Sequence, residues 1–324
     1  MAVFNANMLI KESRKASGLS QIQVAEGICS RQTISAIERG ERKPDWFTFS
    51  NIMRKLNLDP TEYYNDVVGK DEIYIYNQVS LANQLLKSFD FDGLKAEVEK
   101  MEQDERFANG LGYQVLLSFR CNLYSKGPYV NTKLALDYAF EYMKIFRPDF
   151  EIEKIPTYFL SANDIRIINI FSNAYHSLGE IEKSIQISYM LLDNLAKNYY
   201  ANIDNILKVT RVNVTNNLVQ KLLAVATETK SLERFEECIQ VANKGLAMLK
   251  GLNDNIVTYF RLLYCKAYAL MCLGRKDEAG LLMKRCILFS HAMGEDIPFD
   301  MAVDFKKSDL EKNFGYKLEI AVLH

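Results

Sequence analysis

The chain has 324 residues, with 40 Lys and Arg against 41 Asp and Glu, and a formal net charge of −1. This balance, taken over the whole chain, argues against a protein that binds polyanions without selectivity. The chain has only 15 glycines and 6 prolines, so a helical fold with few turns is expected. The six cysteines form no CxxC pair, which argues against a zinc site or a disulfide framework and fits a reducing cytoplasm. No metal or other cofactor is predicted, and neither a signal peptide nor a membrane span is expected.

A series of short capped helices is predicted over residues 1–66. Ser20 and Gln23 have the spacing of a capping box at the start of one helix, and Ser30 is placed to cap the next. Gly18 fits a helix end that needs a left-handed backbone. Two short helices joined by a tight turn are typical of a helix-turn-helix, so a DNA-binding domain is a candidate here.

Three strings of residues make this candidate specific. They are GLSQ at 18–21, ICSRQTIS at 28–35 and IERG at 37–40. Together they resemble the Xre/Cro-type helix-turn-helix family.

The resemblance implies roles for individual side chains. Base reading is implied for Arg31, Gln32, Ser35 and Ala36 on the recognition helix; Arg suits guanine O6 and N7, and Gln suits adenine N6 and N7. Phosphate contacts are implied for Ser20, Gln21, Ser30, Arg39, Arg42 and Lys43. A structural ion pair is implied between Arg14 and Glu38. The alternative that Arg42 and Lys43 are only solvated stays open.

Long helical patterns run in pairs over residues 67–324. Large and small residues alternate at fixed spacing in the clearest pair, at Ile168, Phe171, Ser172, Tyr175, Gly179 and Ser184. The pattern resembles a degenerate tetratricopeptide (TPR) array. The resemblance implies an all-α chain in which about five helix pairs form a right-handed superhelix that ends in a C-terminal cap. The alternating segment 71–76 is predicted to begin the first long helix.

The first helix of each TPR pair lines a concave wall, which is a candidate peptide groove. Carboxamides there can pair with both the amide and the carbonyl of an extended peptide, and an Arg can take a terminal carboxylate. The predicted wall residues are Arg166, Asn169, Asn173, His176, Asn213, Asn216, Gln220, Arg261, Tyr264 and Tyr268. The alternative that these residues are simply solvated stays open.

An Xre-type module followed by TPR-like repeats resembles the RRNPP-type peptide-pheromone receptors, with PlcR-, PrgX- and Rgg-like members. The resemblance implies a cytoplasmic homodimer that regulates transcription from paired or palindromic half-sites in double-stranded DNA. It also implies quorum sensing, in which a short signalling peptide binds the groove and biases the spacing of the two DNA-binding domains. Two alternatives remain open: an Xre-type regulator, or a phage communication receptor, whose repeats bind another peptide or a folded protein.

An enzyme is not expected, because the sequence has no HExxH, GxSxG or P-loop pattern. The charge is also unevenly distributed. Residues 1–58 hold nine Lys and Arg against five Asp and Glu, so a mildly basic N-terminal part precedes an acidic remainder. The near-zero net charge is therefore a cancellation, and the basic end is the one expected to meet DNA.

Overall fold

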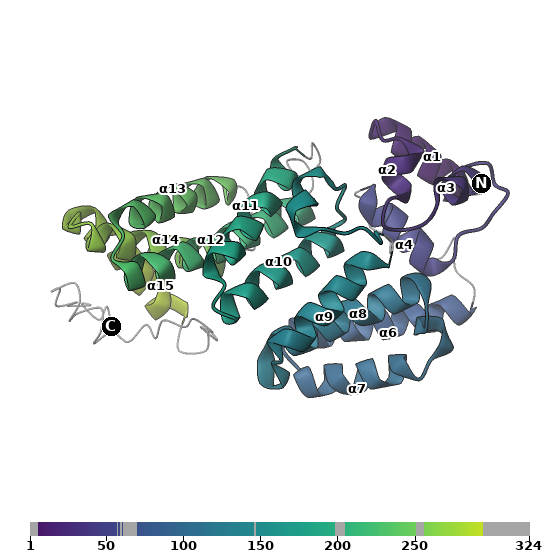
Figure 1. The fold of residues 1–324 in the computed structure, drawn as a ribbon, viewed down its shortest axis with the longest axis horizontal. Coiled ribbons are helices and arrows are strands. Elements are labelled where there is room, and N and C mark those ends of the chain that lie inside the picture. Colours follow the sequence, from purple (N-terminus) through teal and green to yellow (C-terminus); the bar gives the residue numbers. More distant parts are fainter. Residues whose placement is uncertain are drawn as a thin grey trace. The chain divides into compact units, whose positions relative to one another are not determined.

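A computed structural model describes residues 6–56, 58, 60, 70–145, 147–197, 205–250 and 256–293. Every regular element within these ranges is a helix (Figure 1), which confirms the predicted all-α class for the part described. The chain divides into two compact units, residues 1–210 and 211–324. None of the described helices is both long and apolar enough to cross a membrane.

Four helices form the N-terminal part of the first unit, residues 6–58, which we call the head. They are α1 (Ala6–Ala16), α2 (Gln21–Ala25), α3 (Arg31–Glu38) and α4 (Trp46–Lys55). The predicted capping box is present: Ser20 Oγ accepts the Gln23 amide at 3.2 Å, and Gln23 Oε1 accepts the Ser20 amide at 2.8 Å. One apolar stripe of each helix faces the core, where Ile10 and Ile34 are fully buried.

Three helix pairs follow in the first unit, and the predicted helix at residues 71–76 is confirmed. The pairs are α6 (Lys70–Lys87) with α7 (Phe91–Glu102), α8 (Gly110–Ser125) with α9 (Thr132–Lys144), and α10 (Ala162–Ser177) with α11 (Ile181–Lys197). Short 3-10 helices η2 (Glu105–Phe107), η3 (Gly127–Tyr129) and η4 (Ile152–Thr157) lie in the connections.

Small residues bring α10 and α11 together, as the sequence pattern predicts. Ser172 is fully buried, and its hydroxyl group lies 2.7 Å from both the Ser184 carbonyl oxygen and Ser188 Oγ. A larger side chain at any of these three positions would separate the two helices. Gly179 takes a φ of +83° in the turn between them, a conformation that favours glycine.

Two further helix pairs complete the described chain, so the predicted number of about five is confirmed for the described residues. They are α12 (Asn205–Thr229) with α13 (Leu232–Met248), and α14 (Ile256–Cys272) with α15 (Lys276–Met293). A Cβ atom on Gly245 would lie 2.8 Å from Leu262 and 3.1 Å from Thr215, so α13 packs closely against both α14 and α12. The predicted C-terminal cap lies outside the described residues.

The head and the first repeats of its unit share one hydrophobic core. The Phe47 and Phe107 rings meet edge to face, with their centroids 5.5 Å apart. Leu94 and Leu116 belong to the same buried cluster as the isoleucines of the head. The head is therefore attached to the repeats by buried side chains.

An ion pair between Arg14 and Glu38 holds α1 against the end of α3. Arg14 Nε and Nη2 donate to the two oxygens of the Glu38 carboxylate at 2.5 and 2.9 Å, and Gln21 Nε2 donates to it at 2.9 Å. Glu38 is only 8% exposed. Burial opposes ionisation, but the hydrogen bonds from Arg14 and Gln21 outweigh it and hold the pKa of Glu38 below its ordinary value.

The substitution Glu38→Gln is expected to lower the free energy of unfolding of the head by about 2 kcal/mol at neutral pH. A lowered folded pKa stabilises the fold above the unfolded pKa of about 4.3, and this contribution is lost as the pH falls through the folded value. The difference between Glu38→Gln and the native chain should therefore shrink below about pH 4. The chain has one tryptophan, Trp46, whose fluorescence can be recorded during urea unfolding.

The exposed Glu12 of α1 gives the matched control, since Glu12→Gln removes the same charge from the same head without touching the Arg14–Glu38 pair. A Glu38→Gln penalty that is the same at pH 3 and pH 7, or no greater than that of Glu12→Gln, would contradict this account.

Candidate functional site

The outer face of α3 is the candidate for reading DNA bases. Ser30 caps the helix by accepting the Thr33 amide at 3.1 Å, and buried Ile34 and Ile37 fix which face points inward. Arg31 and Gln32 are then exposed in the first turn, and no hydrogen bond or ion pair to a described residue engages either side chain. Their donor and acceptor groups face solvent.

The other two predicted base readers of α3, Ser35 and Ala36, are half-buried. The Ser35 hydroxyl oxygen accepts a hydrogen bond from Arg39. The structure thus places all four predicted base readers on one short helix, with Arg31 and Gln32 the more accessible pair.

The predicted phosphate contacts fall into two groups. Arg42 and Lys43 are exposed after α3. Arg39 is exposed as well, but its Nε and Nη2 donate to the Glu41 carboxylate at 2.6 and 2.7 Å, and this pairing raises the pKa of Arg39. Arg39 is therefore already neutralised by a neighbour on the same surface.

Polar groups at the starts of α2 and α3 are engaged within the head. The Ser20 and Ser30 hydroxyl groups accept helix amides as caps, and the Ser30 hydroxyl also lies 3.0 Å from that of Thr33. Gln21 donates to Glu38. These three predicted phosphate contacts consequently serve the fold in this structure, and Gln21 extends the Arg14–Glu38 ion pair to α2.

The predicted wall residues of the first unit lie along α10. Arg166 and Asn173 are exposed, whereas Asn169 and His176 are half-buried. Arg166 Nη1 donates to Asn163 Oδ1 at 3.3 Å, within the first turn of the same helix. One helical face of α10 thus carries an accessible cation followed by an accessible carboxamide.

In the second unit, the predicted wall residues of α12 differ in exposure. Asn213 and Gln220 are exposed, but Asn216 is only 4% exposed. Within the described residues, the buried Oδ1 atom of Asn216 has no hydrogen-bond partner. A buried acceptor left unpaired costs free energy, so Asn216 is an unusual residue to find in this helix.

The predicted wall residues of α14 are also largely covered. Tyr264 is 4% exposed, and its ring centroid lies 6.2 Å from that of the half-buried Tyr268. Arg261 is half-buried, and its buried Nε atom finds no hydrogen-bond partner among the described residues. Among the described wall residues of the second unit, Asn216 therefore has an unpaired acceptor and Arg261 an unpaired donor.

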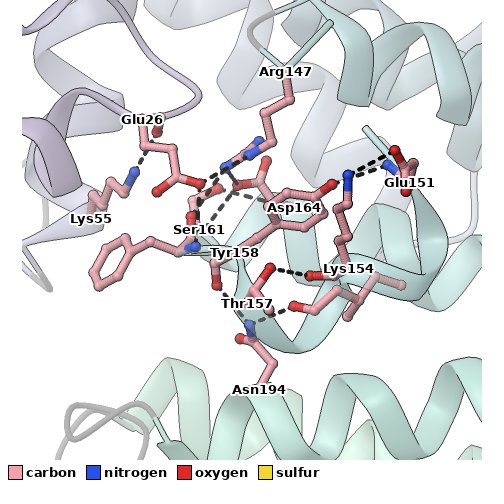
Figure 2. A network of polar contacts seen from close by, with 12 residues as sticks. Glu26, Lys55, Arg147, Glu151, Lys154, Thr157, Tyr158, Ser161, Asp164 and Asn194 are labelled. Atoms are coloured by element: carbon pink, nitrogen blue, oxygen red, sulfur yellow. Dashed lines mark hydrogen bonds and ion pairs between the residues drawn. The ribbon is translucent and has the colours of Figure 1, made fainter. Parts of the chain in front are cut away.

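A buried polar cluster that the sequence analysis did not predict joins the head to the repeats within the first unit (Figure 2). Arg147 is 7% exposed, and its Nη2 atom donates to the Phe159 carbonyl oxygen at 3.0 Å and to Asp164 Oδ2 at 3.1 Å. Its Nε atom lies 3.6 Å from Glu26 Oε1 in the head. The capping-box spacing of Ser161 and Asp164 is the sequence signal that could have identified one member.

Among the described residues, no group of three or more His, Cys, Asp or Glu side chains is arranged to hold a metal ion. Polar and charged side chains that could bind a ligand lie instead on the outer face of α3, along α10, α12 and α14, and in the Arg147 cluster (Figure 2).

Three solved structures are similar to this chain. PlcR from Bacillus thuringiensis, in complex with the peptide PapR7 and DNA, is 17% identical, with a TM-score of 0.48 over 90% of this chain and 99% of that chain. The SHP pheromone receptor Rgg2 from Streptococcus dysgalactiae is 14% identical, with a TM-score of 0.41 over 90% and 95%. The competence regulator ComR from Streptococcus vestibularis, in its apo form, is 20% identical, with a TM-score of 0.43 over 90% and 93%.

No curated protein sequence matches the chain. A family model does match its N-terminal part, and the match covers α2, α3 and α4 together with most of α1. Residues 10–63 match the helix-turn-helix family model HTH_3.

Proposed function

We propose that this protein is a sequence-specific DNA-binding regulator of transcription, active in the cytoplasm as a homodimer on paired half-sites. The observation that carries the proposal is the exposed pair Arg31 and Gln32 at the start of α3, neither of which is hydrogen-bonded or ion-paired to a described residue. Their side chains are the types that bridge the major-groove edges of guanine and adenine. The family match of residues 10–63 supports the same function.

The proposal also assigns the repeats to binding a short signalling peptide. Support comes from the second unit, where the Asn216 acceptor and the Arg261 donor are both buried and unpaired within the described residues. An extended peptide carries one N–H donor and one carbonyl acceptor on each residue, which are the kinds of partner that these two groups lack. On this proposal residues 1–66 form the DNA-binding domain, and residues 67–324 bind peptide and form the dimer.

Arg31→Ala is expected to weaken binding to the preferred duplex by about 1–3 kcal/mol and to relax the preference at one position of each half-site, because a bidentate contact to a base edge is lost. The probe is the duplex that the native protein itself enriches from a random library. Lys15→Ala, which removes an exposed cation from α1, is the matched control. An unchanged base preference in Arg31→Ala would remove this residue from the interface.

Glu41→Gln is expected to release Arg39 for a phosphate contact, since Glu41 is the carboxylate that now occupies it. The logarithm of the DNA association constant, plotted against the logarithm of the salt concentration, should fall with a slope steeper by about 0.9 per protomer. Binding to the same enriched duplex is measured over a series of salt concentrations. The gain should vanish in the double variant Glu41→Gln/Arg39→Ala; a gain that persists there would show that Arg39 is not the residue released.

Asn173→Ala and Asn216→Ala are expected to reduce retention of peptide at least about tenfold, because each removes a carboxamide that can pair with a peptide main chain. The probe is the peptide-sized fraction of spent host culture medium, passed over immobilised protein and read by mass spectrometry. Gln186→Ala on α11 and Gln240→Ala on α13 remove exposed carboxamides from the second helices of the same pairs and serve as controls. Equal retention by all four variants would contradict the predicted wall.

A further inference from the structure

Four charged side chains meet where the head contacts the repeats of the first unit. Glu26 and Lys55 belong to the head, and Arg147 and Asp164 belong to the repeats (Figure 2). The side chains of Arg147 and Asp164 are each only 5% exposed, and Lys55 is also 5% exposed. Two cations and two anions give the cluster no formal net charge, which is the condition under which buried charges are tolerated.

The contacts of this cluster reach into the helix-turn-helix turn itself. Glu26 is the C-cap of α2, and its carbonyl oxygen accepts a hydrogen bond from Lys55 Nζ. Its Oε1 atom accepts the Phe159 amide at 3.4 Å and lies 3.6 Å from Arg147 Nε. Lys55 Nζ lies 4.8 Å from the centroid of the Phe159 ring. The turn between α2 and the recognition helix is therefore held from the repeats.

Gly27, the next residue of this turn, leaves space that the Arg147 guanidinium fills. A Cβ atom on Gly27 would lie 2.6–2.9 Å from three atoms of that group, closer than a real contact permits. Gly27 also takes a φ of +73°. Gly18 has a similar φ of +65°, but a Cβ atom there would meet nothing within 4 Å.

Hydrogen bonds within the repeats also hold the residues on that side of the cluster in place. Asp164 Oδ2 accepts the Ser161 amide at 2.9 Å as part of the N-terminal cap of α10, and Tyr142 donates its hydroxyl to Asp164 Oδ1 at 3.2 Å. Asn194 of α11 donates to the carbonyl oxygens of Ile155 and Tyr158 at 2.8 and 2.7 Å, which fixes the η4 connection. Arg147 thus links the start of α10 to the turn before α3.

We propose that Arg147, a buried residue of the repeats, determines the half-site spacing that the protein accepts in DNA. The inference rests on the proposed function. In a dimeric helix-turn-helix protein, half-site spacing follows from the distance and angle between the two recognition helices. Arg147 pairs with Glu26 and packs against Gly27 in the turn before α3, whereas Arg31 and Gln32 face solvent. It therefore determines where each head can dock, while Arg31 and Gln32 determine which bases it reads.

The test is a selection from a library in which two randomised half-sites are separated by spacers of varied length, with the full-length chain as bait. The native protein is expected to enrich one spacing. Arg147→Met should enrich the same half-site sequences, with the share at the native spacing reduced about fivefold and redistributed to neighbouring spacings. Arg31→Ala should do the reverse, changing the half-site sequence and keeping the spacing.

Two matched pairs separate the proposal from general loss of structure, which circular dichroism and thermal unfolding of each variant would reveal. Arg120→Met removes an arginine that pairs with Glu102 between repeats and should keep the native spacing. Gly27→Ala should widen the range of half-site spacings that is enriched, because it displaces Arg147. Gly18→Ala carries a similar backbone strain and should keep the native spacing. Where Arg147→Met does not fold, Glu26→Gln, with a side chain 31% exposed, takes its place.

The proposal would be overturned if Arg147→Met, Glu26→Gln and Gly27→Ala all enriched DNA with the native half-site spacing alone. So would a native protein that enriches single half-sites with no fixed spacing, although DNA recognition would then stand. A native protein that enriches no duplex would instead overturn the proposed function from which the inference starts.

Discussion

A single buried guanidinium, that of Arg147, lies where the head contacts the repeats of its unit. Hydrophobic packing such as the Phe47–Phe107 contact attaches the head but is non-directional, and it tolerates small rotations. Hydrogen bonds to Asp164 and to the Phe159 carbonyl oxygen fix the guanidinium within the repeats. From there it pairs with Glu26 of the head at 3.6 Å and fills the space beside Gly27. Removing one partner would leave a buried charge uncompensated, so the arrangement resists partial opening. The position of the recognition helix thus depends on polar contacts made far from it in the sequence.

The head is less basic toward solvent than its nine Lys and Arg suggest. Arg14 is bound to Glu38, and Arg39 is bound to Glu41. Lys55 is buried: desolvation lowers its pKa to about 8, against the opposing effects of Asp164 and Glu26. Much of the positive charge therefore serves the scaffold. On the proposed function, long-range attraction to DNA would depend on the remaining exposed cations, which a dimer would double.

The sequence predicts well what is decided by neighbouring residues. Caps at Ser20 and Ser30, the turn at Gly179 and the buried serines of α10 and α11 all follow from patterns within a few turns of helix, and the structure contains each of them. The exposure of wall residues is less predictable, because it depends on which neighbouring helices cover them. The sequence pattern assigns Asn216 and Tyr264 to the concave wall, yet both are almost fully buried. The Arg147 cluster could not be predicted, because Glu26 and Arg147 are 121 positions apart and no local pattern relates them.

The cluster has a feature that apolar packing would lack. Among the described residues, Arg147 Nε and Nη1 have no hydrogen-bond partner, and Glu26 Oε1 lies just beyond hydrogen-bond distance at 3.6 Å. A displacement of well under 1 Å would bring Arg147 Nε within hydrogen-bond distance of Glu26 Oε1. A ligand can shift the position of the head only if it binds one position more tightly than another. The wall residues of α10 begin at Arg166, two positions after Asp164, so a peptide held there would act on the same short helix start that Arg147 binds.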